Sequence, residues 1–156
     1  MLTKSQKLLL YIIEKKKVVD DKTKLAKYQY FSDFIHFAFH NKSISGTGTI
    51  YSRQKQGPLN RNLSCDLDKL KEEGYIIEKP NFNYQVKKNI KVGLTTEEKK
   101  TVDFVLNKYG DLNYKELVNI SHNQLPYLSA KEGEIIEFIT AYNLVDEYQD
   151  YNSYMS

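Results

Sequence analysis

The residues with the clearest potential for chemistry are two histidines, His36 and His40, in an aromatic stretch of the chain. A helix places side chains four positions apart on one face, and Asp33 lies one turn earlier. Two imidazoles and a carboxylate are ligands that zinc accepts. However, Phe37 stands where zinc-protease helices carry glutamate, and Cys65 has no cysteine partner. We therefore expect no metal and no cofactor, and interpret His36 and Asp33 as part of a buried hydrogen-bond network.

Other patterns for catalysis are incomplete as well. The run from Ser45 to Thr49 contains two glycines, but it has no lysine partner and does not lie between a strand and a helix start. Cys65 falls among leucines, where cysteine commonly packs as a small apolar side chain. The sequence has no nucleophile elbow and no dinucleotide-binding fingerprint. The chain is therefore predicted not to be an enzyme.

The elements that would position these residues alternate between helices and short strands. Caps and apolar stripes predict helices over residues 3–16, 22–41, 61–73 and 95–109, and two more that start at Asn113 and Ser129. β-Branched and aromatic residues predict strands over residues 49–53, 75–78 and 84–92, with Gly57-Pro58 as a turn after the first. The helix over 22–41 is apolar nearly all round, so it should be the buried centre.

The order of strand, helix and hairpin resembles a winged-helix unit. We expect an α+β fold that is predominantly α-helical, in a single domain with a small antiparallel β-sheet. Residues 1–145 are predicted to form this domain. Residues 146–156 are acidic and rich in tyrosine, lack apolar periodicity, and are predicted to be a flexible tail.

Charge is unevenly spread along the 156 residues, although the net charge is only +3. Residues 1–100 hold 20 Lys/Arg and 11 Asp/Glu, whereas residues 101–156 hold 3 and 9. The single cysteine suits a reducing compartment, and no signal peptide and no apolar run of membrane length is present. These features predict a cytoplasmic protein with no membrane partner.

The basic half leaves nucleic-acid binding open as an alternative. On this interpretation the chain is a winged-helix-type DNA-binding transcriptional regulator that uses Arg53, Lys55, Arg61, Lys87, Lys88 and Lys91. Against it, the helix at the recognition position carries the carboxylates Asp66, Asp68, Glu72 and Glu73, which we expect to be exposed and to repel phosphates.

The order and spacing of several motifs resemble the Panacea domain, also described as the SocA-like antitoxin domain. The matching positions are Tyr30-Phe31-Ser32-Asp33, Ser45-Gly46, Tyr51, Gly57-Pro58, and then Leu117, Ser121, His122, Pro126 and Tyr127. The resemblance covers about residues 5–140. Two departures are Lys27-Tyr28-Gln29-Tyr30, where Lys-Leu-Leu-Tyr is usual, and the absence of tryptophan after His122.

The resemblance implies function by binding. Panacea proteins are typically antitoxins that neutralise the toxin of an adjacent gene by direct contact, and are often carried by prophages or mobile elements. One branch acts as an adaptor that delivers its toxin to a protease. The residues expected to bind the partner are Tyr30, Asp33, Tyr51, Arg53, Gly57, Pro58, Asn60, His122 and Tyr127.

Overall fold

The computed structural model describes residues 1–88 and 91–156 and confirms the predicted α+β class, mostly helical with small antiparallel sheets. The helices are α1 (Lys4–Lys16), α2 (Lys22–His40), α3 (Leu63–Glu72), α4 (Thr96–Tyr109), α5 (Tyr114–His122), α6 (Leu125–Ser129), the 3-10 helix η1 (Phe138–Leu144) and α7 (Tyr151–Met155). The strands are β1 (Val18–Val19), β2 (Tyr51–Gln54), β3 (Gly57–Asn60), β4 (Ile76–Lys79), β5 (Asn83–Val86) and β6 (Ile135–Ile136).

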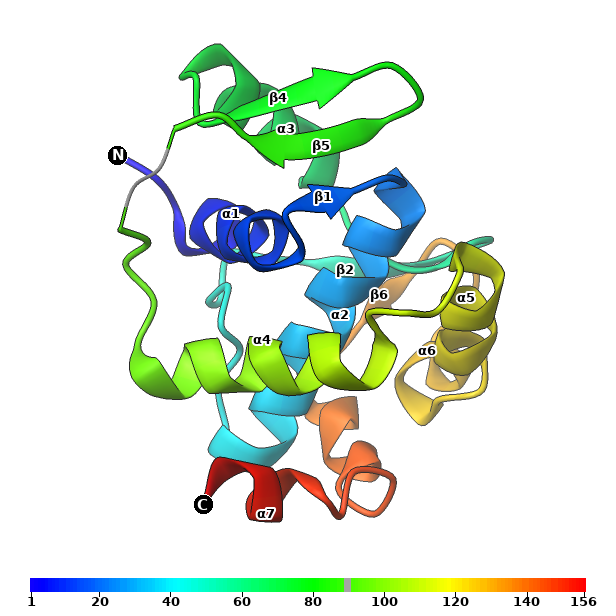
Figure 1. The fold of residues 1–156 in the computed structure, drawn as a ribbon. Coiled ribbons are helices and arrows are strands. Elements are labelled where there is room, and N and C mark those ends of the chain that lie inside the picture. The colour runs from blue at the N-terminus through cyan, green and yellow to red at the C-terminus, as the bar shows by residue number, and fades with distance from the viewer. Residues whose placement is uncertain (89–90) are drawn as a thin grey trace.

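Helix α2 is the centre of the molecule, as its composition predicts. It runs through the middle of Figure 1, with α1, α4 and η1 packed around it. The aromatic side chains from Tyr28 to Phe34 are fully buried, and Phe37 and Phe39 near its end are partly buried against the same core. A helix contacted on several sides can bury apolar residues around its full circumference, which explains why it lacks a polar face.

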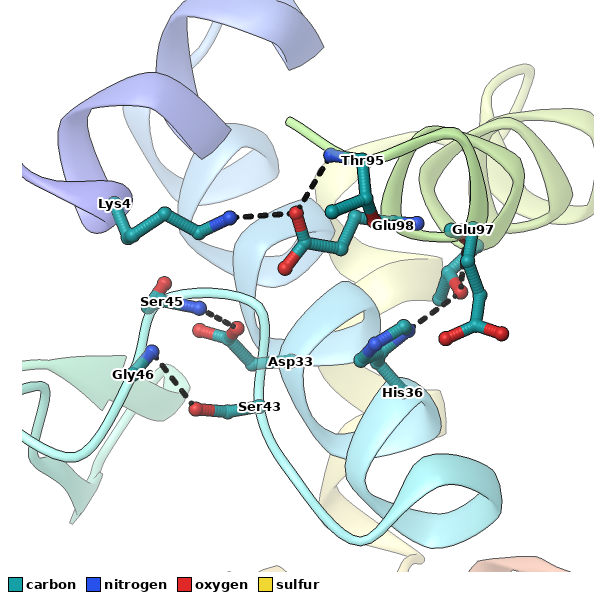
Figure 2. Close-up of polar contacts among 10 residues, drawn as sticks. Lys4, Asp33, His36, Ser43, Ser45, Gly46, Thr95, Glu97 and Glu98 are labelled. Atoms are coloured by element: carbon teal, nitrogen blue, oxygen red, sulfur yellow. Dashed lines mark hydrogen bonds and ion pairs between the residues drawn. The ribbon is translucent and has the colours of Figure 1, made fainter. Parts of the chain in front are cut away.

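Capping boxes begin three of the predicted helices. Thr3, Thr95 and Asn113 each accept a hydrogen bond from the backbone three residues later, and the side chain there bonds back. The same Glu98 that completes the Thr95 box forms an ion pair with Lys4 at 2.5 Å, which joins α4 to α1 (Figure 2).

The winged-helix-like unit forms, but with a different strand from the one predicted. β1 pairs with β5, and the sheet order is β1-β5-β4, so the strand before α2 completes the hairpin sheet. The predicted strand over 49–53 corresponds to β2, which belongs to another sheet. Strand β5 is shorter than the predicted range of 84–92, and residues 89–90 of that range lie outside the described part of the chain.

The second sheet, of order β3-β2-β6, corrects two predictions. Gly57 and Pro58 begin β3 and are paired with β2, so the turn lies at residues 55–56 instead. A proline is tolerated there because β3 is an edge strand. Ile135 and Ile136 form β6 against β2, so the helix predicted from Ser129 is wrong. The β-branched residues Ile135 and Ile136 pair with the free edge of β2. This edge is distant in the sequence, so the local apolar periodicity could not predict the pairing.

The segment after Val145 packs onto the domain through two tyrosines. Tyr148 and Tyr151 are 0% and 1% exposed. Their hydroxyls contact the Tyr109 hydroxyl at 2.7 Å and Thr101 Oγ1 at 2.6 Å, both on α4. The expectation of a loosely ordered tail does not describe these two side chains, whose spacing of three buries them on one side of the segment. In the described part of the chain, no helix is long and apolar enough to cross a membrane.

Candidate functional site: the hairpin joint and the basic groove

The histidine cluster differs from the predicted one in its carboxylate. Candidate ligand atoms of His36, His40 and Glu97 lie within 4.8 Å of one another, whereas Asp33 is not part of this group. His36 Nδ1 contacts Thr101 Oγ1 at 2.8 Å, and His40 Nε2 contacts the Tyr151 hydroxyl at the same distance. Burial, with neighbouring His40, lowers the pKa of His36 to about 4. The histidines thus take part in hydrogen bonds that join α2 to α4 and α7.

Four of the expected partner-binding residues are buried supports. Tyr30, Asp33 and Tyr51 are fully buried, and Asn60 is 1% exposed. Asp33 accepts a hydrogen bond from the Ser45 amide at 2.8 Å (Figure 2). It accepts another from the Tyr51 hydroxyl at 2.6 Å. Burial raises the pKa of Asp33 to about 6. These side chains hold β2 and the 43–46 loop against α2, so they can affect a partner only through the surfaces they support.

Tyr30 and Asn60 have the same kind of supporting contacts. The Tyr30 hydroxyl donates to Gln124 Oε1 at 2.8 Å, across to the start of α6. Asn60 Nδ2 donates to Gln29 Oε1 at 3.2 Å and to Ser5 Oγ at 3.3 Å. The end of β3 is thereby fixed to both α2 and α1.

Three other expected residues meet in one joint between the β2–β3 hairpin and α5–α6. The Arg53 guanidinium lies 4.4 Å from the Tyr127 ring centroid, and its Nη1 donates to the Ala130 carbonyl at 2.7 Å. The His122 ring stacks on Tyr127 with centroids 4.5 Å apart. The Tyr127 hydroxyl donates to the Gln54 carbonyl at 2.8 Å. Stacking, cation–π and hydrogen-bond contacts together fix the hairpin to these helices.

Gly57 lets the hairpin approach the helices closely. Its φ of +104° lies in the region that favours glycine, and a Cβ there would lie 2.7 Å from both Lys27 Cε and Ser121 Oγ. The next residue, Pro58, accepts a hydrogen bond from Lys27 Nζ at 2.8 Å. The Gly-Pro pair is therefore a contact point between β3, α2 and α5, and not a turn.

A groove of about 400 Å³ opens beside this contact, between the start of α2, the hairpin and the start of α3. It is lined by Lys22, Thr23, Ala26, Lys27, Gln54, Lys55, Gln56, Gly57, Leu59, Asn60, Arg61, Leu63 and Ser64. Four of these residues are lysine or arginine, and within the described chain no aspartate or glutamate lines the groove. The groove therefore favours an anionic ligand.

Lys27 is the most unusual residue of the groove. Its side chain is 1% exposed, and burial lowers its pKa to about 7. The sequence motifs include Lys27 but do not mark it, or Lys22, as a site residue. The position of Lys27 among Leu25, Ala26 and Tyr28 on an apolar helix is the sequence feature that could have indicated a buried, functional lysine.

The six residues named for nucleic acid do not form one surface. Arg53 belongs to the joint, and Lys55 and Arg61 line the groove. Lys88 lies at the other end of α3, where it donates to the Glu73 carbonyl and sits 4.5 Å from the Tyr75 ring. The ten residues of α3 span about 15 Å, which separates Lys88 from the groove.

Among the other residues considered for DNA binding, the expectation for one residue is wrong. Lys87 and Lys91 are exposed, on the chain that follows β5. Asp66 is buried and accepts a hydrogen bond from Ser5 Oγ at 2.7 Å, so the expectation that it faces solvent is wrong. Asp68 and Glu72 are exposed on α3, as expected.

Comparison with known families gives a match to the family described as antitoxin SocA-like, Panacea domain, over residues 25–127 of the 156-residue chain. The chain belongs to this family. The matched Panacea region begins on α2 and ends at Tyr127, so it contains both sides of the joint and every residue that lines the groove from Ala26 onward. Comparison with curated proteins and with solved structures gives no match.

Proposed function

We propose that this Panacea-domain protein is an antitoxin that neutralises a cognate toxin by direct binding, with the joint and the groove as its contact surface. Membership of the SocA-like antitoxin family supports the antitoxin role. The observation that carries the choice of surface is that motifs 70 residues apart, at Gly57 and Tyr127, meet there. Arginine and tyrosine are frequent anchors of protein interfaces, and both occur in the joint.

A rigid surface of this kind suits tight binding, because little conformational freedom is lost when the partner docks. The hairpin is anchored by Tyr127, His122 and Lys27, so its orientation does not have to be set by the partner. The proposal includes two outcomes for the bound toxin, sequestration or delivery to a protease. We also propose that the gene for this protein is carried by a prophage or mobile element.

The test is co-expression of the tagged protein with the product of its adjacent gene. We expect that the adjacent product alone stops growth, that co-expression restores growth, and that a stoichiometric complex remains after nuclease treatment. Arg53→Ala should weaken the complex, whereas Lys100→Ala, an exposed position on α4, should not. Absence of both protection and complex would reject the antitoxin proposal. A shortened toxin half-life during rescue would favour delivery to a protease over sequestration.

DNA binding is a second candidate, supported by the winged-helix-like sheet order β1-β5-β4 next to α3. The exposed carboxylates Asp68 and Glu72 on α3 oppose it, because they would face the phosphates. Electrophoretic shift of duplex DNA at several salt concentrations tests it. Binding that weakens steeply with salt, and is lost in Lys55→Glu, would support this candidate, and no shift even at low salt would dispose of it.

A further inference from the structure

Lys27 places a cationic group in the interior without an acidic partner. Its side chain is 1% exposed, and none of the ion pairs in residues 1–88 and 91–156 includes it. An ammonium group has three donor hydrogens, and the Pro58 carbonyl takes one of them. Buried charges are normally paired, because an unpaired one is costly to desolvate. Lys27 lines the groove, so its amine has further donors for an acceptor that binds there.

The surroundings of Lys27 define the chemistry of that ligand. Lys22 and Arg61 place two further cations on the groove at its two helical ends, and Lys55 adds a third from the hairpin. Lys22 Nζ also donates to Ser64 Oγ at 2.6 Å, which links the starts of α2 and α3. A carboxylate that enters the groove would thus meet cations from three elements. Such a site attracts a negatively charged ligand and fixes the orientation in which it binds.

The groove also has an apolar side. Ala26, Leu59 and Leu63 line it together with the cations. Leu59 is half-buried, so part of its side chain is available for contact. A ligand with both carboxylate and apolar groups would use this lining fully, whereas a nucleic-acid backbone offers only charge to it. The exposed carboxylates Asp68 and Glu72 on α3 also oppose nucleic acid.

We propose that this groove binds an acidic peptide segment of the toxin, with one carboxylate against Lys27 and an apolar side chain against Leu59 and Leu63. The inference rests on the proposed function, since the toxin is the partner. Gly57 matters for this site because its missing side chain leaves room for the Lys27 stem between β3 and α5. Lys27 therefore acts as a binding residue whose burial strengthens its contact with the carboxylate.

The test measures affinity between the purified protein and the adjacent gene's product by biolayer interferometry. Lys27→Met removes the charge but keeps an unbranched side chain, and we expect it to weaken binding by roughly 30-fold or more, the effect of breaking a buried charge pair. The double reversal Lys55→Glu with Arg61→Glu should weaken binding by about 10-fold or more, with a larger loss at low salt. The matched controls Lys87→Glu and Lys100→Glu change exposed lysines outside the groove and should leave affinity within about 2-fold.

The outcomes separate this inference from the function on which it rests. If the wild-type protein does not bind the adjacent product, the proposed function fails. If the wild type binds and the groove variants bind equally well, the groove inference is overturned while the antitoxin proposal stands. If the groove variants lose binding to duplex DNA instead, the groove serves nucleic acid and the peptide proposal is wrong. Thermal unfolding of each variant confirms that it is folded.

Discussion

Replacement of Lys27 by methionine should make the protein more stable, and more so at low pH than at high pH. Burial lowers the pKa of Lys27 from 10.5 to about 7. Between these two values the unfolded chain binds more protons than the folded one, so the Lys27 contribution to wild-type stability rises with pH across this window. Below pH 7 both states are protonated, and the folded state bears the full desolvation cost.

The size of the effect follows from the same shift. A pKa change from 10.5 to about 7 corresponds to roughly 4–5 kcal/mol below pH 7. At pH 9 the desolvation cost of Lys27 is about 2 kcal/mol, because the amine of the folded state has lost its proton at this pH. Lys27→Met also loses the hydrogen bond to the Pro58 carbonyl, which costs about 1–3 kcal/mol at every pH. We therefore expect a net gain of about 2 kcal/mol at pH 6 and little or no gain at pH 9.

Urea unfolding of the wild type and the variant at pH 6 and pH 9 measures this difference. Tyrosine fluorescence is a suitable probe, since the chain has 13 tyrosines and no tryptophan. Lys55→Met is the matched control, because Lys55 is exposed, and its effect should stay within about 0.5 kcal/mol at both pH values. If Lys27→Met lowers stability by the same amount at pH 6 and pH 9, the amine carries no desolvation cost, and Lys27 is not the desolvated cation on which the carboxylate-binding groove depends.

Three further predictions concern the supports of the site. Gly57→Ala should lower the free energy of unfolding by about 2 kcal/mol or more, because the position combines a positive φ with two close contacts. The control Gly48→Ala, where a Cβ would meet no atom within 4 Å, should change this free energy by less than about 1 kcal/mol. Equal effects of the two substitutions in urea unfolding would contradict the close approach of the hairpin at Gly57. Asp33, with its pKa raised to about 6, should make wild-type stability decline by about 2 kcal/mol as pH rises from 4 to 6, since the folded state keeps its proton to higher pH than the unfolded chain. Asp33→Asn should lack that part of the decline in the same assay, and an unchanged pH profile would argue against a desolvated carboxylate. Truncation to residues 1–145 should lower the free energy of unfolding by about 4 kcal/mol or more, because it removes the buried side chains of Tyr148 and Tyr151. The thermal midpoint of unfolding measures this loss, and an unchanged midpoint would show that residues 146–156 add no stability.

Much of the fold could be predicted because it depends on local chemistry. The caps at Thr3, Thr95 and Asn113 satisfy helix-end amides within four residues, so the sequence alone is sufficient to locate them. The all-round apolar character of α2 likewise determines its central position. The errors lie where a segment's conformation depends on a distant partner. Ile135 and Ile136 would suit a helix or a strand, and the open edge of β2 makes them a strand.

The same division holds for the candidate site. The sequence by itself determined the Panacea motifs and therefore named Gly57, His122 and Tyr127, since motifs are linear properties of the chain. Only the tertiary structure decided that these positions form one joint, and that Tyr51 faces inward and donates to the buried Asp33 carboxylate. It also decided that Lys27 is buried beside a groove whose lining, in the described part of the chain, includes no aspartate or glutamate. Burial and charge compensation arise from contacts between segments far apart in the chain, so no local pattern encodes them.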